Sequence, residues 1–582
     1  MRPRPLRSYK PLLLRGRRLR SDRAVAAWAC FCLIGAIGAL LSAEFAKHPV
    51  IAASAAHQEA TLEDPDRVCA GCHREIYERY EKTPMARASG LAADGLIEGD
   101  FTHAISGIRY RVFLRGGQAW MAYDRISAGN GPELHGELPL SYYVGSGRRG
   151  RTYLFDRDGW WFEAPVNYYS KKKLWDMAPN YGSAKSMPAT LPVDSNCLHC
   201  HASEVQTALP EARNDYAGAP FLAGGVSCAA CHGDPSQHLA QQGRGAIVNP
   251  AKLSATKRDS VCLQCHLEGE VTVYRAGKSV AAYLPGDDLS DFAAYFVDAR
   301  IRGGGGRATS QYEALLRSAC KRASGEKLTC TSCHDPHGSP DVEERASFYR
   351  SKCLACHTGE KMEKEHHAEQ QDCAACHMPR RETDDIAHEQ LTDHDIERHP
   401  HADAKKVGGQ NAVLAPVGGW RSDDRELGLA YAELAEQGNM DAGEQALNLL
   451  RKAEHEGASD AELHLQLGFL EQLSGGPEAA QHEYEAALQE NPHENTAMTN
   501  LAVIDASQEK LGEAKRLIEE AFTDDPSQSA AGLDLAFLEC RLGNKAKALA
   551  TLERVQQFNP DNRAAHEFMQ TGRYGNQSCK LR

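Results

Sequence analysis

Seven copies of the pattern Cys-x-x-Cys-His constrain this chain more than any other feature of its sequence. The chain has 19 cysteines, and fourteen of them fall in these motifs. The paired cysteines are Cys69 and Cys72, Cys197 and Cys200, Cys228 and Cys231, Cys262 and Cys265, Cys330 and Cys333, Cys353 and Cys356, and Cys373 and Cys376. The histidines that follow directly are His73, His201, His232, His266, His334, His357 and His377.

This spacing suits covalent haem attachment. Two intervening residues let one turn of chain present both thiols to the vinyl groups of a single porphyrin, and the adjacent histidine then lies beneath the iron. Zinc sites need two such pairs per ion and give no reason for a histidine after every pair. Disulfides across two residues are strained and reducible. We therefore predict seven covalent haems c, fourteen thioether cysteines and seven proximal histidine ligands.

The second axial ligand of each iron decides between electron transfer and catalysis. The other histidines between residues 69 and 401 are His103, His135, His199, His238, His337, His366, His367, His388, His394, His399 and His401, and Met85 offers a thioether. We expect His135, His199, His399 and His401 to be ordinary surface residues. The distal candidates are then Met85, His103, His238, His337, one of His366 and His367, His388 and His394. Seven candidates for seven irons favour six-coordinate haems that transfer electrons, with no catalytic residue assigned.

The remaining cysteines, Cys30, Cys32, Cys320, Cys540 and Cys579, have no evident partner, and we expect them to be unpaired thiols.

The first residues are typical of a targeting segment. Residues 1–23 hold eight Arg, one Lys and one Asp, and residues 24–43 then carry no charge. The basic side should stay cytoplasmic, which places the rest of the chain outside. Twenty uncharged residues favour an uncleaved anchor in the inner membrane over a cleaved signal, with 44–64 as a linker. The protein should lie on the periplasmic side, anchored or secreted. The net charge of −13 leaves −21 outside residues 1–23, which argues against nucleic-acid partners.

The predicted haem region spans residues 65–401. A stretch of about 101–170 within it has no motif, and the alternation of Ile108, Tyr110, Val112 and Leu114 predicts strands. Gly116-Gly117 and Asp158-Gly159 predict two hairpins. The later motifs are closely spaced, so loops and short helices should surround the porphyrins. Residues 402–423 are predicted to be a linker.

A period of 34 residues follows the predicted linker. It is carried by Leu467, Leu501 and Leu535, by Ala480, Ala514 and Ala548, and by Pro492, Pro526 and Pro560. The period is typical of tetratricopeptide repeats, here four units over residues 424–571 with a tail at 572–582. Such arrays bind peptides or partner proteins on a concave surface, although a purely structural cap is the alternative. The predicted fold class is mainly α: a loop-rich multihaem domain with a small β-rich insertion, then a helical solenoid.

Several strings resemble a bacterial family of multihaem c-type cytochromes fused to tetratricopeptide repeats, related to cytochromes c of nitrogen metabolism. They are Cys69-Ala-Gly-Cys-His with Tyr77, Gly145-Ser-Gly, Trp175-Asp-Met-Ala-Pro, Gly225-Val-Ser-Cys-Ala-Ala-Cys-His-Gly, Leu328-Thr-Cys-Thr-Ser-Cys-His-Asp-Pro-His and Thr392-Asp-His. The resemblance covers residues 65–400 and the repeats. It implies distal roles for His238, His337, His388 and His394, and it supports Met85. It supplies no substrate, and the Cys-x-x-Cys-Lys motif of pentahaem nitrite reductases is missing from the sequence.

These observations predict an electron carrier more than a catalyst, one that docks redox partner proteins through its repeats. Two alternatives stay open. One is a reductase or oxidase of a small nitrogen or sulfur species at a five-coordinate haem. The other is an assembly or scaffold protein with structural haems.

Overall fold

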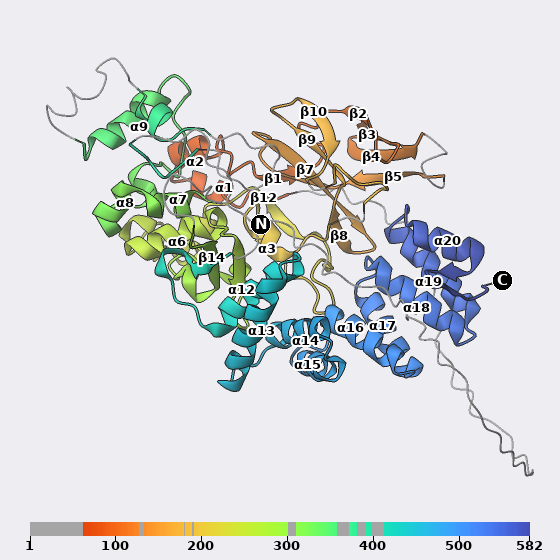
Figure 1. Ribbon diagram of the computed structural model, residues 1–582. Coiled ribbons are helices and arrows are strands. Elements are labelled where there is room, and N and C mark those ends of the chain that lie inside the picture. The colour runs from red at the N-terminus through yellow and green to blue at the C-terminus, as the bar shows by residue number, and fades with distance from the viewer. Residues whose placement is uncertain are drawn as a thin grey trace, which may run out of the picture.

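A computed structural model describes residues 62–126, 133–179, 181–188, 191–300, 310–357, 372–380, 392–398 and 412–581. Figure 1 shows three parts: a region of short helices that carries the motifs, a group of sheets, and an arc of paired helices. We call residues 62–88 and 191–398 the haem-binding region and residues 424–571 the helical array. No helix within the described residues is long and apolar enough to cross a membrane. The predicted membrane segment 24–43 lies outside them.

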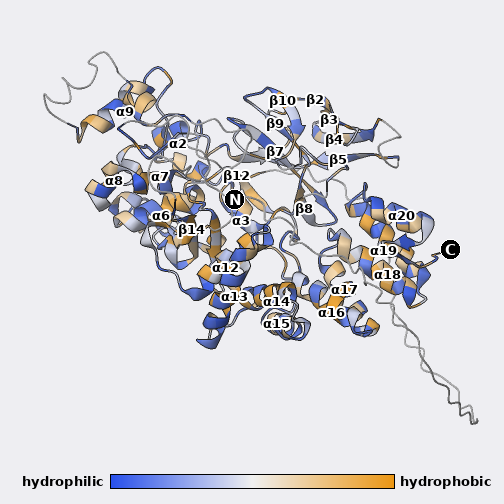
Figure 2. Cartoon of the chain, in the orientation of Figure 1, coloured by the Kyte–Doolittle hydropathy of each residue, from blue (hydrophilic) through white to orange (hydrophobic). Residues whose placement is uncertain are grey.

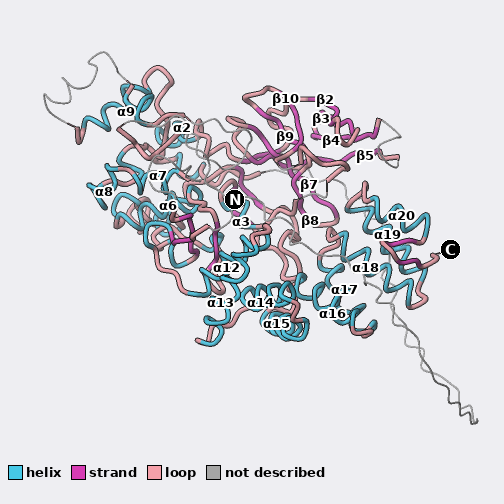
Figure 3. The backbone as a smooth tube through the Cα atoms, in the orientation of Figure 1, coloured by secondary structure: helices cyan, strands magenta, loops and turns pink. Residues whose placement is uncertain are grey.

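The β-rich part contains two antiparallel sheets. The first has the strand order β2-β3-β4-β5, and the second has β1-β6-β7-β9-β10 with β8 paired to β7. Their bounds are β1 Ser89–Leu91, β2 Gly99–His103, β3 Ile108–Arg115, β4 Gln118–Arg125, β5 His135–Leu140, β6 Tyr142–Val144, β7 Gly150–Arg157, β8 Trp160–Glu163, β9 Val166–Tyr169 and β10 Leu174–Met177. The insertion is therefore larger than predicted, and the N-terminal half is rich in strands, so "mainly α" describes only the C-terminal half (Figure 3).

Both predicted hairpins are present. Gly116 and Gly117 connect β3 to β4, and Asp158 and Gly159 connect β7 to β8, with the flanking residues in direct register. All four turn residues have positive φ, from 55° to 97°. Two-residue turns of this kind need positive φ at both positions, which glycine and aspartate tolerate. The turns bring the apolar strand faces together, and Tyr110, Met121 and Phe155 are fully buried between them.

The haem-binding region is built from short helices joined by loops. The helices are α1 Arg67–Ala70, α2 Arg74–Tyr80, α3 Ser195–His199, α4 Ala229–His232, α5 Ser236–Ala240, α6 Ala255–His266, α7 Gln311–Arg317, α8 Ala319–Ser324, α9 Arg345–Leu354 and α11 Cys373–His377, with 3-10 turns that include η6 Cys330–Ser332. The motif-bearing helices α1, α4, α9 and α11 bury no side chain against protein. Polypeptide alone therefore forms little core around these motifs.

The predicted linker 402–423 is wrong in part, because its second half belongs to a sheet of the haem-binding region. β15 (Leu414–Pro416) pairs with β14 (Ala293–Asp298), and β14 pairs with β13 (Val271–Tyr274). Leu414 and Phe296 join a hydrophobic core with Leu429 and Tyr431 of the array. A second small sheet pairs β11 (Ala202–Val205) with β12 (Phe221–Gly224).

The helical array consists of four antiparallel helix pairs and a ninth helix. The helices are α12 Asp424–Glu436, α13 Met440–His455, α14 Ala461–Ser474, α15 Pro477–Glu490, α16 Asn495–Ser507, α17 Leu511–Asp524, α18 Ser529–Arg541, α19 Lys545–Phe558 and α20 Arg563–Thr571. The small residues of the 34-residue period are buried where helices cross: Ala480, Ala514 and Ala548 are 0% exposed. Figure 2 shows that the helices carry both apolar and polar residues, as expected where one face of a helix packs against its neighbours and the other faces solvent.

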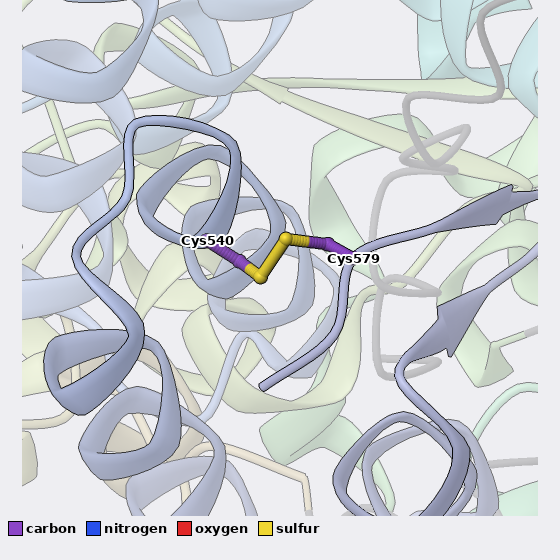
Figure 4. Close-up of a disulfide and its surroundings, with 2 residues drawn as sticks. All are labelled: Cys540 and Cys579. Atoms are coloured by element: carbon purple, nitrogen blue, oxygen red, sulfur yellow. A yellow bond between two sulfur atoms is a disulfide. The ribbon is translucent and has the colours of Figure 1, made fainter. Parts of the chain in front are cut away.

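The tail is tied to the array by a disulfide between Cys540 and Cys579 (Figure 4). These two cysteines were expected to be unpaired, and that expectation is wrong. The tail forms the hairpin of β16 (Arg573–Tyr574) and β17 (Gln577–Ser578), and this turn brings Cys579 back against α18.

Both ends of the array are attached to the rest of the protein. The first repeat packs on β13 and β14, and the last repeat packs on the β-rich part through Phe558, which contacts Trp160 and Phe162. Arg125 and Asp561 form an ion pair across the second contact, with side chains 1% and 0% exposed. The array therefore spans between two parts of the protein and is not a free appendage.

Candidate haem-binding site

Each motif folds into about one helical turn, which gives the cysteine–histidine spacing its geometry. The backbone N–H of the motif histidine donates to the carbonyl of the first cysteine in at least four motifs, for example from His73 to Cys69 at 2.8 Å and from His232 to Cys228 at 2.9 Å. His334 and His357 repeat this bond to Cys330 and Cys353 at 3.0 Å. Because residues four apart lie on one helical face, the thiol and the imidazole face the same side. None of the fourteen motif cysteines forms a disulfide, whereas Cys540 and Cys579 are joined by one.

Three motif histidines each face a predicted distal ligand. The ring centres of His73 and His238 are 6.4 Å apart with planes 17° from parallel, and those of His232 and His337 are 6.0 Å and 8° apart. His334 faces His394 at 6.3 Å. Two imidazoles that bind one metal ion from opposite sides, each by a bond of about 2 Å, have ring centres about 6 Å apart. These residues therefore fit bis-histidine ligation of a haem iron.

Hydrogen bonds at Nδ1 leave the Nε2 atom of these rings for a metal. His232 Nδ1 lies 2.9 Å from the Val248 carbonyl, His238 Nδ1 lies 3.1 Å from the Gly245 carbonyl, and His394 Nδ1 lies 2.8 Å from the Thr392 carbonyl. A carbonyl at Nδ1 keeps the proton there and directs the lone pair of Nε2 outward. His377 shares the arrangement, with Nδ1 2.7 Å from the Glu397 carbonyl.

Burial keeps several motif imidazoles in the neutral form that binds metals. Burial lowers the pKa of His201 to about 4, and it also lowers the pKa of His266 and His334. A neutral imidazole at neutral pH presents a lone pair without first losing a proton.

Contacts between thiols show how the motifs lie next to one another. Cys69 contacts Cys228, Cys200 contacts Cys265, Cys262 contacts Cys330, and Cys353 contacts Cys373. The first motif thus lies beside the third, the second and fifth beside the fourth, and the sixth beside the seventh. The motifs form neighbouring sets and are not scattered over the fold.

Three aspartates that the sequence analysis did not identify hold the motifs in place. Asp66, Asp194 and Asp259 each stand three residues before the first cysteine of a motif. Asp194 accepts from the N–H of its own Cys197 at 3.0 Å. Asp66 and Asp259 instead accept from another motif, from Cys228 N–H at 2.8 Å and Cys330 N–H at 3.0 Å. An aspartate three residues before the first cysteine is visible in the sequence, so this repeated spacing could have identified these residues.

His103 was predicted to be a distal ligand, and the structure argues against it. Its Nδ1 lies 2.9 Å from Ser106 Oγ and its Nε2 lies 3.1 Å from the Gly182 carbonyl. The ring is buried in β2 and both nitrogens are already engaged, so neither is left for iron. The position of His103 in the predicted β-rich stretch could not show where its ring would point.

The other predicted distal ligands stay predictions. Met85 lies in a turn after α2, which ends at Tyr80. His366, His367 and His388 lie outside the described residues, as do His399 and His401. His135 is exposed on β5. His199 is partly buried, with Nε2 2.8 Å from Gln264 Oε1.

Two family models match parts of the chain. A model described as cytochrome c554 and c-prime matches residues 167–233, and a tetratricopeptide-repeat model matches residues 505–570. The Multiheme cytochrome MtrA of Shewanella baltica (strain OS185) is 24% identical over 178 residues, which cover 28% of this chain and 52% of that protein. The chain thus matches about half the length of this curated relative.

Solved structures of repeat proteins match about a quarter of the chain. YrrB, described as a TPR protein with an unusual peptide-binding site, is 20% identical and covers 24% of this chain and 73% of its own, with a TM-score of 0.22. A MamA structure (AMB-1) is also 20% identical and covers 26% and 82%, with a TM-score of 0.23. Scores this low carry no argument about function. Taken with the motifs, the family and curated matches support a multihaem c-type cytochrome with tetratricopeptide repeats.

Proposed function

We propose that this protein holds seven covalent haems and passes single electrons among them on the periplasmic side of a bacterial membrane. The haem iron supplies the one-electron couple. The chain's fourteen motif cysteines fix the porphyrins, and its seven motif histidines bind the irons from one side. The carbonyls that accept from the Nδ1 atoms orient the imidazoles and raise their basicity.

One observation carries this proposal: the three histidine pairs join different motifs in a regular order. The first motif receives its second histidine from just after the third motif, and the third receives His337 from just after the fifth. The fifth receives His394, which follows the seventh. Each pair therefore ties one motif to a segment that adjoins another motif. This interleaving holds successive redox centres next to one another, and electron transfer depends steeply on distance.

The periplasmic location is supported by two features. The basic residues 1–23 and the uncharged stretch 24–43 favour export or anchoring. The disulfide between Cys540 and Cys579 is of a kind that persists in oxidising compartments. We further propose that the helical array docks a redox partner protein, since tetratricopeptide arrays are protein-interaction modules.

The test uses holoprotein matured in a host that attaches c-type haem. Its intact mass should exceed that of the mature chain by seven haems, and a potentiometric titration should reduce the haems reversibly. Carbon monoxide added to the reduced protein should bind only a small fraction of them. Binding to several haems, or a catalytic current with a small nitrogen or sulfur oxyanion, would favour a reductase. Haems that do not titrate would favour a scaffold.

A further inference from the structure

A cavity of about 400 Å³ lies where the helical array meets the haem-binding region. Its walls come from α12, α14, the turn between α15 and α16, and the loop after β13. It is therefore formed by two regions that are far apart in sequence. We call it the acidic cavity, after the residues described next.

Carboxylates outnumber cations in the acidic cavity. Six acidic residues line it: Glu433, Glu436, Asp460, Glu462, Glu490 and Glu494. Three basic residues also line it: Arg275, Lys278 and Arg425. Two of them form ion pairs. Arg425 pairs with Asp460, and Arg275 lies 2.8 Å from Glu426, which does not line the cavity. Lys278 is exposed at the loop. The lining therefore attracts positive charge.

A buried amide oxygen adds a second feature. Gln466 lines the cavity and is only 4% exposed. Its Nε2 donates to Glu436 Oε1 at 3.0 Å and to Glu462 Oε1 at 3.3 Å, which fixes the side chain, but its Oε1 accepts no hydrogen bond among the described residues. A buried acceptor without a donor costs about 1–3 kcal/mol. An N–H donor brought by a ligand would remove that cost.

The cavity lies at the end of a strand that follows a haem motif. Tyr274 ends β13 and lines it, and β13 begins at Val271, five residues after the motif histidine His266. Arg425 of α12 donates to the Tyr274 carbonyl at 3.1 Å, so the array is bonded to this strand. A partner held here would rest beside the fourth motif.

We infer that the acidic cavity binds a lysine- or arginine-rich extended segment of a redox partner protein and so docks that partner next to the fourth motif. This rests on the proposed docking role of the array and names its site and the chemistry of its partner. The carboxylates neutralise the cationic side chains, and Gln466 Oε1 accepts from an N–H of the segment. The volume admits side chains of a segment and not a folded domain.

The binding test uses the full-length holoprotein and a dye-labelled heptapeptide of alternating Lys and Ala, followed by fluorescence anisotropy. The peptide should bind, and added salt should weaken its binding because salt screens the partly exposed charges. The double variant Glu433→Gln, Glu494→Gln should bind five- to tenfold more weakly. The matched control Glu444→Gln, Glu553→Gln changes the same charge at exposed positions of α13 and α19 and should bind like the wild type.

Two further variants separate this site from general charge attraction. Lys278→Glu removes the exposed cation and should tighten binding several-fold, an effect that misfolding cannot produce. Gln466→Ala should weaken binding without changing its salt dependence. Equal loss in the cavity and control double variants, or equal binding of a Glu-Ala heptapeptide, would overturn the inference. Reversible potentiometric titration of the same samples reports separately on the proposed electron transfer, which stands or fails independently of peptide binding.

Discussion

The imidazole rings of His232 and His337 lie 6.0 Å apart, centre to centre, with planes 8° from parallel. One belongs to the third motif and the other follows the fifth, and the same alternation relates His73 to His238 and His334 to His394. The motifs are therefore interleaved, and no motif with its following loop forms a separate unit. Loss of one distal histidine should affect one haem and leave the others ligated.

His337→Met tests this ligation. The variant should keep seven haems by mass, and the potential of one haem should rise because a thioether raises it relative to imidazole. His337→Ala should instead create one new site that binds carbon monoxide in the reduced protein. Spectropotentiometry and gas titration measure these outcomes. His199→Ala is the control, since the Nε2 of His199 is engaged with Gln264, and its spectra should match the wild type. Unchanged spectra in His337→Ala would rule out this pairing.

Asp259→Ala should weaken the link between the fourth and fifth motifs. Asp259 is 3% exposed and accepts from the Cys330 N–H at 3.0 Å, and hydrogen bonds to a charged group contribute about 1.5–3 kcal/mol. The free energy of unfolding of the holoprotein, measured by denaturant titration, should fall by that amount. In Asp291→Ala only an exposed ion pair with Arg421 is lost, which is worth less than about 1 kcal/mol. Equal unfolding midpoints for the two variants would contradict the bridging role.

Asp561→Ala should release the last repeat from the β-rich part. Asp561 Oδ2 accepts from Arg125 and from the Met187 N–H at 2.7 Å, and the ion pair is buried. Removing one partner of a buried pair costs about 3–5 kcal/mol, because the other charge is left uncompensated. Limited proteolysis should then cut the last repeat more readily than in the wild type. The double variant Arg125→Met, Asp561→Leu should recover much of the stability, and a double variant as weak as Asp561→Ala would argue against this explanation.

The disulfide should contribute substantially to the stability of the last repeat. It joins residues 39 apart, and closing a loop of that length stabilises by about 4 kcal/mol in the chain-entropy model. Cys540→Ala with Cys579→Ala should lower the unfolding midpoint of the array by circular dichroism and leave the haem spectrum unchanged. Cys320→Ala, at a cysteine outside the motifs and the disulfide, is the control. Peptide mapping without reductant should find the 540–579 link, and a free thiol at either position would contradict it.

The array's stability should depend on pH through His464 and Glu483. A hydrogen bond from His464 Nδ1 to Glu483 at 2.8 Å raises the pKa of His464. Burial alone would raise the pKa of Glu483, but hydrogen bonds from His464 and Arg451 lower it overall. The histidine's contribution is complete below its unfolded pKa of about 6.5 and is lost as pH rises through its folded value. The carboxylate's contribution is complete above about 4.3 and is lost as pH falls through its folded value.

The melting temperature of the array should therefore be highest between about pH 5 and 6.5 and fall toward pH 8.5. Thermal melts at 222 nm measure this dependence. His464→Gln should flatten the decline above pH 6.5, whereas His135→Gln, at an exposed position on β5, should not. Parallel pH profiles for the wild type and His464→Gln would show that this pair does not govern the dependence.

The helical turns of the Cys-x-x-Cys-His motifs and the repeat array could be predicted from the sequence because both are local. Cys69 and His73 are joined by a bond within one helical turn, and the four-residue spacing alone sets which groups share a face. The repeats are likewise set by a 34-residue period that places Ala480, Ala514 and Ala548 at helix crossings. The two hairpins followed from turn residues that accept positive φ.

Only the tertiary structure decided which segments meet. The ring of His103 could have faced an iron or the protein, and the fold turned it toward Ser106 and Gly182. Asp66 bonds to Cys228, 162 residues away, and Cys540 meets Cys579 through a terminal hairpin. These contacts depend on the packing of whole segments, which periodicity and spacing do not encode. The sequence by itself determined where the Cys-x-x-Cys-His motifs lie, and long-range packing decided which histidines face the motif histidines.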